Sequence, residues 1–279
     1  MKVAIIGTGL IGGSMALSLR KKNFANTIYG VEQNEVNARR ALERKIVDEI
    51  LPVQDAVAKA DLTIISVPVN AAEKMILPIL DSVENQVVFD VGSTKSSLCN
   101  IIKNHPNRGR FVATHPMWGT EYSGPDAATE SGFEDKTVVI CEKGKTDKDA
   151  LELAKKVYGI LKMKIVYMNA EAHDIHAAYV SHISHITSFA LANTVLEKEK
   201  EESAIFEMAS GGFESTVRLA KSNPDMWLPI FQQNRENVLD VLNEHISQLK
   251  KFRSCFEKDN YDYMRTLIEN ANKIKKIIH

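Results

Sequence analysis

Short apolar runs alternate with amphipathic stretches over the first 168 residues of the chain. Runs of four to six apolar residues are typical of strands buried in a parallel sheet, and amphipathic stretches of the helices that cover its faces. The runs predict strands at 3–6, 27–31, 62–67, 87–91, 110–114, 137–141 and 164–168, and stretches such as 34–45 and 147–163 predict the helices. This order predicts an α/β domain with a largely parallel sheet over residues 1–168.

The pattern changes after residue 168, where no strand-like alternation follows. The stretch 171–202 is consistent with one helix, of which about 27 residues would span roughly 40 Å. From Val180 to Leu196 it is apolar on most faces, so more than one neighbour must cover it. Further helical patterns lie at 226–259 and 261–277. These features predict an all-helical domain over residues 169–279, and its large apolar surface predicts a homodimer.

Composition and charge exclude several classes of protein. The 279 residues are 44% hydrophobic and 25% charged, as is usual for globular proteins. A net charge of −1, with scattered Lys and Arg, excludes a nucleic-acid or acidic-membrane surface. The N-terminal stretch resembles a secretion signal only superficially, since no small-residue cleavage site closes it, and no later run is long enough to span a membrane. Because Cys99, Cys141 and Cys255 are widely separated, we expect a reducing compartment, the cytoplasm.

The first apolar run leads into GTGLIG, in which Gly7, Gly9 and Gly12 have GxGxxG spacing. The motif follows a predicted strand and opens a predicted helix, and Glu32 lies at the end of the next strand. This context is the dinucleotide-binding fingerprint of a Rossmann-type domain, in which the helix N-terminus receives the phosphates. Glu32 would bind the adenosine ribose and repel a 2′-phosphate, so NAD is favoured over NADP. Further candidate cofactor contacts are Leu10, Ile11, Val67 and Pro68.

Two polar loops follow strands at the carboxyl edge of the predicted sheet, where open α/β sheets bind ligands. Ser93 lies in DVGSTKSS after the strand at 87–91, and His115 lies in THPMWGTEYSG after the strand at 110–114. Pro116 favours extended backbone at His115. An unperturbed imidazole titrates near neutrality, so we expect His115 to accept a proton during catalysis.

Five motifs occur in order over most of the chain: GTGLIGGS, DVGSTK, HPMWGTEYSG, HDIHAAYVSHISH and GGFESTVRLAKSNPDMW. Together they resemble the prephenate and arogenate dehydrogenase (TyrA) family. The resemblance implies an NAD(P)-binding domain followed by a helical domain that dimerises. It also implies oxidative decarboxylation of a cyclohexadienyl compound on the way to tyrosine, with His115 as the catalytic histidine and Ser93 as the active-site serine that orients it.

The resemblance also assigns substrate-binding residues. Arg218 would pair with a substrate carboxylate, and Glu121 would act as a gate that reaches Arg218 when no substrate is bound. The remaining members of the set are His182, His185, Gly211 and Gly212. The GGF segment is expected near the active site of the partner subunit.

Two departures from the family pattern alter expectations for the helical domain. Ser184 stands where the family usually has proline, which predicts a straighter helix. Ser215 stands where the family often has an aspartate, and the neighbouring Glu214 is an open substitute in the ionic network.

Two histidine pairs, HDIH (173–176) and HISH (182–185), raise the possibility of a metal site. On a straight helix the centres of the pairs lie about 180° apart, so one ion cannot bind all four side chains. The sequence therefore predicts no metal, and His173 and His176 are interpreted as structural.

Alternative functions remain open at this point. Prephenate is the predicted substrate, with arogenate as the alternative, because the two differ only by a keto or amino group. A β-hydroxyacid dehydrogenase is less favoured, since such enzymes use a lysine of the helical domain and the first lysine of this central helix is Lys198. A non-catalytic NAD-sensing protein would not need Ser93, His115 and Arg218 to converge.

Overall fold

The computed structural model describes residues 1–200 and 205–277. The chain divides into two compact units, Met1–Asn234 and Arg235–His279. Every residue predicted for the site lies in the first unit.

Eight strands of the first unit form one sheet, in the order β3-β2-β1-β4-β5-β6-β7-β8. The strands are β1 (Lys2–Ile6), β2 (Thr27–Val31), β3 (Glu49–Ile50), β4 (Leu62–Ile65), β5 (Val87–Asp90), β6 (Phe111–Pro116), β7 (Thr137–Cys141) and β8 (Lys164–Met168). Neighbouring strands pair in parallel, except that β6 and β7 are antiparallel. The seven predicted strands are confirmed, and the two-residue β3, which is too short to show a period, is an addition.

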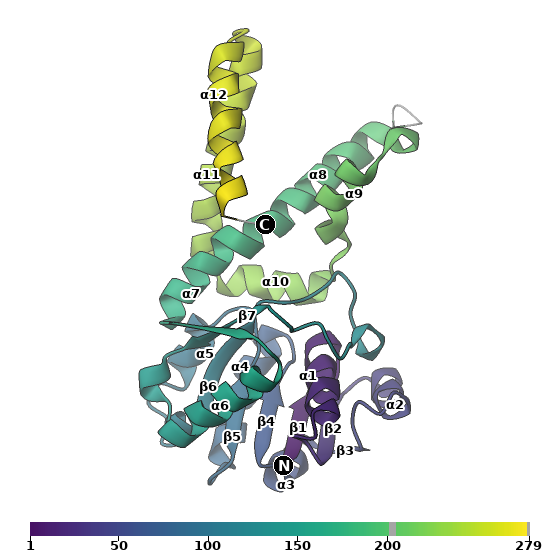
Figure 1. The fold of residues 1–279 in the computed structure, drawn as a ribbon, viewed down its shortest axis with the longest axis vertical. Coiled ribbons are helices and arrows are strands. Elements are labelled where there is room, and N and C mark those ends of the chain that lie inside the picture. Colours follow the sequence, from purple (N-terminus) through teal and green to yellow (C-terminus); the bar gives the residue numbers. More distant parts are fainter. Residues whose placement is uncertain (201–204, 278–279) are drawn as a thin grey trace. The chain divides into compact units, whose positions relative to one another are not determined.

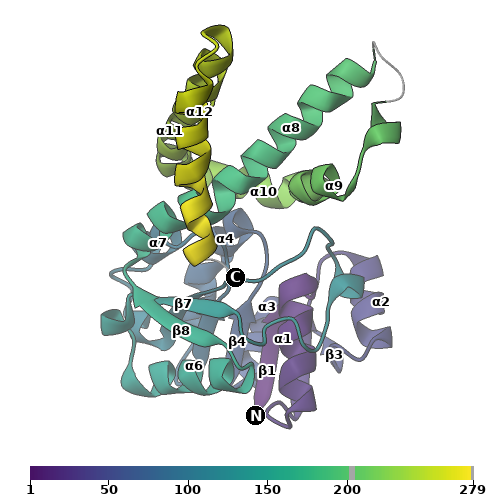
Figure 2. The ribbon, with the colours of Figure 1, turned by 45° about the horizontal axis from the view of Figure 1, so that its top comes forward.

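Helices cover both faces of this sheet (Figures 1 and 2). They are α1 (Leu10–Lys21), α2 (Glu35–Glu43), α3 (Val53–Lys59), α4 (Val69–Asp81), α5 (Ser96–Ile101) and α6 (Lys148–Ile160). On one face, Met15 of α1 and Val157 of α6 join one apolar cluster with the strands. On the other, Ile76 of α4 and Leu98 of α5 join a second cluster. Each fully buried side chain of this size stabilises the fold by about 1.5–3 kcal/mol.

The chain after β8 is helical, as the sequence predicts. The first unit continues with α7 (Ala170–Ala177), the π-helical turn η4 (Ala178–His182), α8 (Ile183–Glu199), α9 (Gly211–Val217), the short turn η6 (Arg218–Lys221) and α10 (Pro224–Gln233). The second unit contains α11 (Arg235–Glu257) and α12 (Tyr261–Ala271). The predicted helix 171–202 is thus interrupted by η4, and its last two residues lie outside the described ranges. The stretch 226–259 forms two helices that meet at Asn234.

Asparagine side chains cap several of these helices. Asn34, Asn169, Asn223 and Asn260 each accept a hydrogen bond from a backbone amide in the first turn of α2, α7, α10 and α12. Such a cap typically stabilises a helix by about 0.5–2 kcal/mol. The cap at Asn169 starts α7 directly after β8, which places His173 next to β6.

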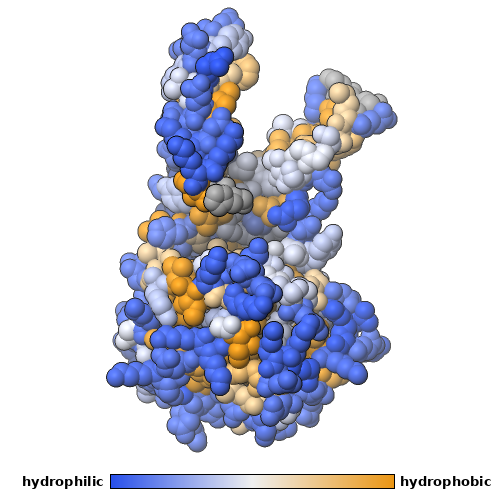
Figure 3. Space-filling view, viewed as in Figure 1, coloured by the Kyte–Doolittle hydropathy of each residue, from blue (hydrophilic) through white to orange (hydrophobic). Residues whose placement is uncertain are grey.

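The surface of the described residues is mostly hydrophilic over the helices that flank the sheet (Figure 3). Hydrophobic side chains gather at the end of the α8–α9 hairpin, where Phe206 is 41% and Met208 is 87% exposed. Among the described residues, no helix has the length and apolarity needed to cross a membrane.

Candidate active site

The turn between β1 and α1 is shaped by glycine and leaves open space beside it. Gly7 has a φ of +95°, and a Cβ there would lie 2.7 Å from the Ser66 carbonyl oxygen. A Cβ on Gly12 would lie 2.2 Å from the Gly7 carbonyl oxygen, whereas one on Gly9 would meet no atom nearer than 4.0 Å. Helix α1 begins at Leu10 with no side-chain cap. No N-cap side chain therefore bonds the first N–H groups of α1, as the predicted diphosphate site requires.

Glu32 is held in place at the end of β2. Its Oε2 accepts hydrogen bonds from Thr8 Oγ1 at 3.0 Å and Thr8 N at 3.3 Å, and its Oε1 accepts one from the backbone amide two residues later at 3.1 Å. Val67 lies against the glycine turn, Pro68 caps α4, and Ile11 packs on the core. The carboxylate is thus held at the end of β2 by these hydrogen bonds, and its contact with a ribose stays a prediction.

His115 lies near the end of β6, is only 8% exposed, and is hydrogen-bonded to a second histidine. Its Nδ1 is 2.8 Å from Nε2 of His173 on α7, whose Nδ1 is 2.8 Å from Oδ1 of Asp174. The Asp174 carboxylate also accepts hydrogen bonds from the amides of Lys95 at 2.8 Å and Ser96 at 2.9 Å. A chain of two imidazoles and a carboxylate therefore runs from β6 to the start of α5.

Burial holds the pKa of His115 well below its usual value, and nearby His173 and Lys95 lower this pKa further. The Lys95 ammonium is fully buried and paired with Asp90. Burial favours a raised pKa at Asp174, but the hydrogen bonds from His173 and from backbone amides outweigh it and lower that pKa. His115 is therefore neutral at physiological pH, and its titration lies below the neutral range that an unperturbed imidazole predicts.

A second buried histidine lies next to this chain. Asn234 Nδ2 is 2.7 Å from the Asp174 carbonyl oxygen and 3.2 Å from Nδ1 of His182. The His182 ring meets the Trp227 ring edge-on, with 5.9 Å between centroids. Burial lowers the pKa of His182 to about 4.

The π-helical turn η4 is the reason that His173 and His182 face the same site. Nine residues of regular α-helix would place them about 180° apart, but one additional residue in a π turn reduces this offset to roughly 80°. Both side chains are at most 2% exposed. The prediction of oppositely facing pairs is therefore wrong for His173 and His182, and His176 is exposed. That Ser184 leaves the helix straighter than a proline would stays a prediction. Among the described residues, no three or more His, Cys, Asp or Glu side chains are arranged so that they could hold a metal ion.

The rings of His182 and His185 both contact the Trp227 ring, and the exposed Arg218 guanidinium lies near His185. The His185 ring stacks on Trp227 with 3.5 Å between centroids. The Trp227 indole N–H is buried and has no hydrogen-bond partner among the described residues. Burial lowers the pKa of His185, and nearby Arg218 lowers it further. Arg218 Nη1 donates to Glu121 Oε2 at 2.9 Å, so the predicted ion pair is present.

Ser93 is not where the sequence prediction needs it to orient His115. Ser93 is half-buried in the turn after β5, and within residues 1–200 and 205–277 no hydrogen bond joins it to His115. His173 orients that ring instead. The sequence interpretation treated His173 as structural and did not single out Asp174 or Asn234, although the adjacent His-Asp pair was a visible signal.

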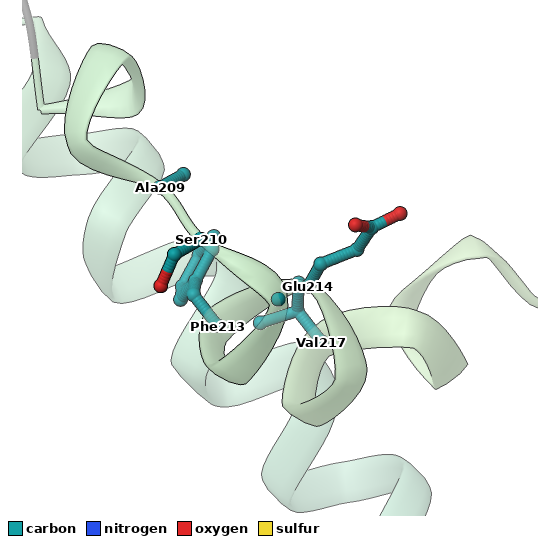
Figure 4. Close-up of a pocket in the computed structure, with 6 residues that line it drawn as sticks. Ala209, Ser210, Phe213, Glu214 and Val217 are labelled. Carbon is teal, nitrogen blue, oxygen red and sulfur yellow. The ribbon is translucent and has the colours of Figure 1, made fainter.

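Gly211 and Gly212 begin α9, and both are exposed. Gly211 lines a surface cavity of about 280 Å³ together with Phe213 and Glu214 (Figure 4). The Glu214 carboxylate points away from Phe213. The ion pair of Arg218 is with Glu121, and none joins Arg218 to Glu214 in the part of the chain that the structure describes. Glu214 therefore does not take the place of the family aspartate in this arrangement.

Comparisons with known proteins place both parts of the chain in one family. Residues 15–167 match the family model "Prephenate dehydrogenase, nucleotide-binding domain", and residues 169–270 match "Prephenate dehydrogenase, dimerization domain". The chain is 32% identical to the prephenate dehydrogenase of Bacillus subtilis over 273 residues, which is 96% of this chain and 74% of that protein. It is 30% identical to the cyclohexadienyl dehydrogenase of Zymomonas mobilis over 276 residues, covering 98% and 94%. The crystal structure of prephenate dehydrogenase from A. aeolicus, in complex with hydroxyphenyl propionate and NAD+, superposes with a TM-score of 0.88 at 30% identity, covering 100% of this chain and 98% of that chain.

Proposed function

Because this chain belongs to the prephenate dehydrogenase family, a family of oxidoreductases, we propose that it converts prephenate to 4-hydroxyphenylpyruvate by NAD-dependent oxidative decarboxylation, in tyrosine biosynthesis. The observation that carries this proposal is the buried, neutral His115 at the carboxyl edge of the sheet. It belongs to the same compact unit as the glycine turn and Arg218.

The β1–α1 turn fits NAD. Gly7 and Gly12 allow the tight turn, the space beside Gly9 admits the diphosphate, and the Glu32 carboxylate would accept hydrogen bonds from the adenosine ribose. The same carboxylate would repel a 2′-phosphate, which favours NAD over NADP. When bound, NAD supplies the acceptor for the hydride that leaves the hydroxyl-bearing ring carbon.

His115 accepts the proton of the C4 hydroxyl at Nε2, since its Nδ1 is engaged with His173. The hydroxyl becomes more acidic as the hydride departs, and loss of CO2 from the opposite ring carbon makes the ring aromatic. General-base assistance of this kind is typically worth about 10²–10⁴ in rate. The Asp174 carboxylate stabilises the positive charge that the two imidazoles receive.

Arg218 binds a substrate carboxylate after releasing Glu121, which acts as the gate. His182, His185 and Trp227 line the space for the ring. Burial lowers the pKa of both histidines, so their rings line this space in the neutral form.

We also propose a homodimer through a helical domain that begins at residue 169 and follows an NAD-binding domain over residues 1–168. Along α8 only Ser188 is buried, and Leu196 is 51% exposed; Val180, in the preceding turn η4, is 66% exposed. A second copy would cover this surface and place Gly211 near its partner's active site. Light scattering at nanomolar concentration should show a dimer, and an active monomer would contradict the proposal. The three buried thiols agree with a cytoplasmic setting.

The function is tested by NADH production at 340 nm with prephenate, arogenate and a small β-hydroxy acid in parallel. We expect the highest kcat/KM with prephenate. His115→Asn keeps a hydrogen bond but removes the base, so kcat should fall about 10²–10⁴-fold with little change in NAD affinity. The exposed His176→Asn on α7 is the matched control. Near-normal kcat in His115→Asn would show that the mechanism is wrong.

A further inference from the structure

The hydrogen bonds around Asp174 determine which nitrogen of each buried histidine carries its proton. We propose that Asp174 fixes His115 as a proton acceptor at Nε2 and His182 as a proton donor at Nε2, acting through His173 and Asn234 as positioning residues. The catalytic purpose of this arrangement rests on the proposed function, but the proton positions themselves do not.

The tautomer of His115 follows from the hydrogen bonds of Asp174 and His173. The Asp174 carboxylate accepts two backbone amides, so it is ionised and can only accept from Nδ1 of His173. A neutral His173 then presents a lone pair at Nε2. The 2.8 Å contact to His115 requires one proton, which must be on Nδ1 of His115. The lone pair of His115 is therefore at Nε2.

The alternative proton arrangement would make His173 a cation and reverse His115. The groups that face His115 disfavour a positive charge on His173. The buried Lys95 ammonium lies at the start of α5, and His182 lies in η4. The carboxylate of Asp90 is already paired with Lys95, and that of Asp174 is 2.8 Å from the far nitrogen of His173. A second buried cation beside Lys95 would be costly, so the neutral arrangement is favoured before substrate reacts.

The tautomer of His182 follows from the hydrogen bonds of Asn234. Asn234 Nδ2 lies 2.7 Å from the Asp174 carbonyl oxygen, which only accepts, so this atom is the amide nitrogen rather than the amide oxygen. Its second N–H is directed to Nδ1 of His182 at 3.2 Å. Nδ1 of His182 must accept, and the single proton of the neutral ring is on Nε2.

The two histidines are thus chemically complementary, although both are neutral and buried. His115 offers a lone pair to a substrate hydroxyl, and His182 offers an N–H to a substrate oxygen. Asp174 determines both proton positions. Its side chain acts on His115 through His173, and its backbone carbonyl acts on His182 through Asn234. The two neutral tautomers of histidine are otherwise nearly equal in energy. Without these partners, each ring would also populate the tautomer with its proton on the other nitrogen.

Neutron diffraction from crystals of the deuterated native dimer tests the assignment without any substitution. We expect deuterium on Nδ1 of both His115 and His173, and on Nε2 of His182. Deuterium on Nε2 of His115 or on Nδ1 of His182 would overturn the inference. Correct deuterium positions in an enzyme inactive on both cyclohexadienyl substrates would overturn the proposed function and leave the proton assignment in place.

A pair of variants tests the catalytic consequence. His173→Gln can still accept from His115 Nδ1, whereas His173→Leu cannot. We expect kcat with prephenate to fall about 10²-fold or more in His173→Leu and less than about 10-fold in His173→Gln, with unchanged NAD affinity. His176→Leu, on the exposed side of α7, is the control. Equal losses in both His173 variants, or no loss in either, would contradict the positioning role.

Discussion

His182 should make the stability of this protein depend steeply on pH. Its pKa is about 4 in the folded chain because the ring is buried, against about 6.5 in an unfolded chain. As the pH falls below about 6.5, the unfolded chain takes up a proton that the folded chain does not bind, so the free energy of unfolding decreases. The decrease levels off below about pH 4, where the folded state takes up the proton as well. At pH 4.5 linkage gives a loss of roughly 2.5 kcal/mol from this one side chain.

The perturbation that isolates this loss is His182→Asn, because its Oδ1 can accept from Asn234 but does not titrate. Urea unfolding is followed by circular dichroism at pH 7.5 and 4.5, at one fixed protein concentration because a dimer is expected. The variant should have a lower free energy of unfolding at both pH values. The decrease in this free energy from pH 7.5 to 4.5 should, however, be smaller in the variant than in the native chain by roughly 2.5 kcal/mol. The exposed His176→Asn should leave the difference unchanged. If the free energy of unfolding decreased equally from pH 7.5 to 4.5 in the native chain and in His182→Asn, His182 would not be buried in its neutral form.

Three further predictions concern the cofactor and substrate contacts. Glu32→Ser should weaken NAD use and relieve the repulsion of NADP, and an unchanged ratio of kcat/KM for the two cofactors would place Glu32 away from the ribose. Arg218→Ala removes a charge-assisted hydrogen bond worth about 1.5–3 kcal/mol, so KM for the cyclohexadienyl substrate should rise about 10-fold or more. Arg218→Lys should restore only part of this loss because the planar fork is absent, and an unchanged KM in both variants would assign Arg218 to another ligand. Gly12→Ala puts a methyl group 2.2 Å from the Gly7 carbonyl oxygen, so calorimetric NAD affinity should fall at least 10-fold, and native affinity would argue against this turn as the cofactor site.

Much of the fold was predictable because it depends on local patterns. Buried strands produce continuous apolar runs, and the glycine turn has a spacing dictated by close backbone contacts. The short edge strand β3 has only two residues and leaves no periodic signal. The ion pair between Glu121 and Arg218 was accessible only through the family resemblance, since 97 residues separate its members.

The least predictable part of the site was the support of His115. The sequence prediction assigned the orientation of His115 to Ser93, which lies in the turn after the neighbouring strand β5, and treated His173 as structural. That interpretation assumed a helix of constant pitch, on which His173 and His182 diverge. Nothing in the residue types of Ala178–His182 signals a π turn, because such a turn is stabilised by the packing on either side of it.

The π turn also determines how the site responds to a change in the number of residues in the helix. Val180 lies inside the turn and is 66% exposed, so replacing it with another residue alters no contact of the site. Deleting it would leave eight regular α-helical steps between His173 and His182, which amount to about 800°, or the same offset of roughly 80° that the π turn gives. His182 and His185 would therefore keep their direction relative to His173. The turn thus accommodates one residue more than regular α-helical geometry needs, and related chains can differ here by one residue in length as well as in sequence.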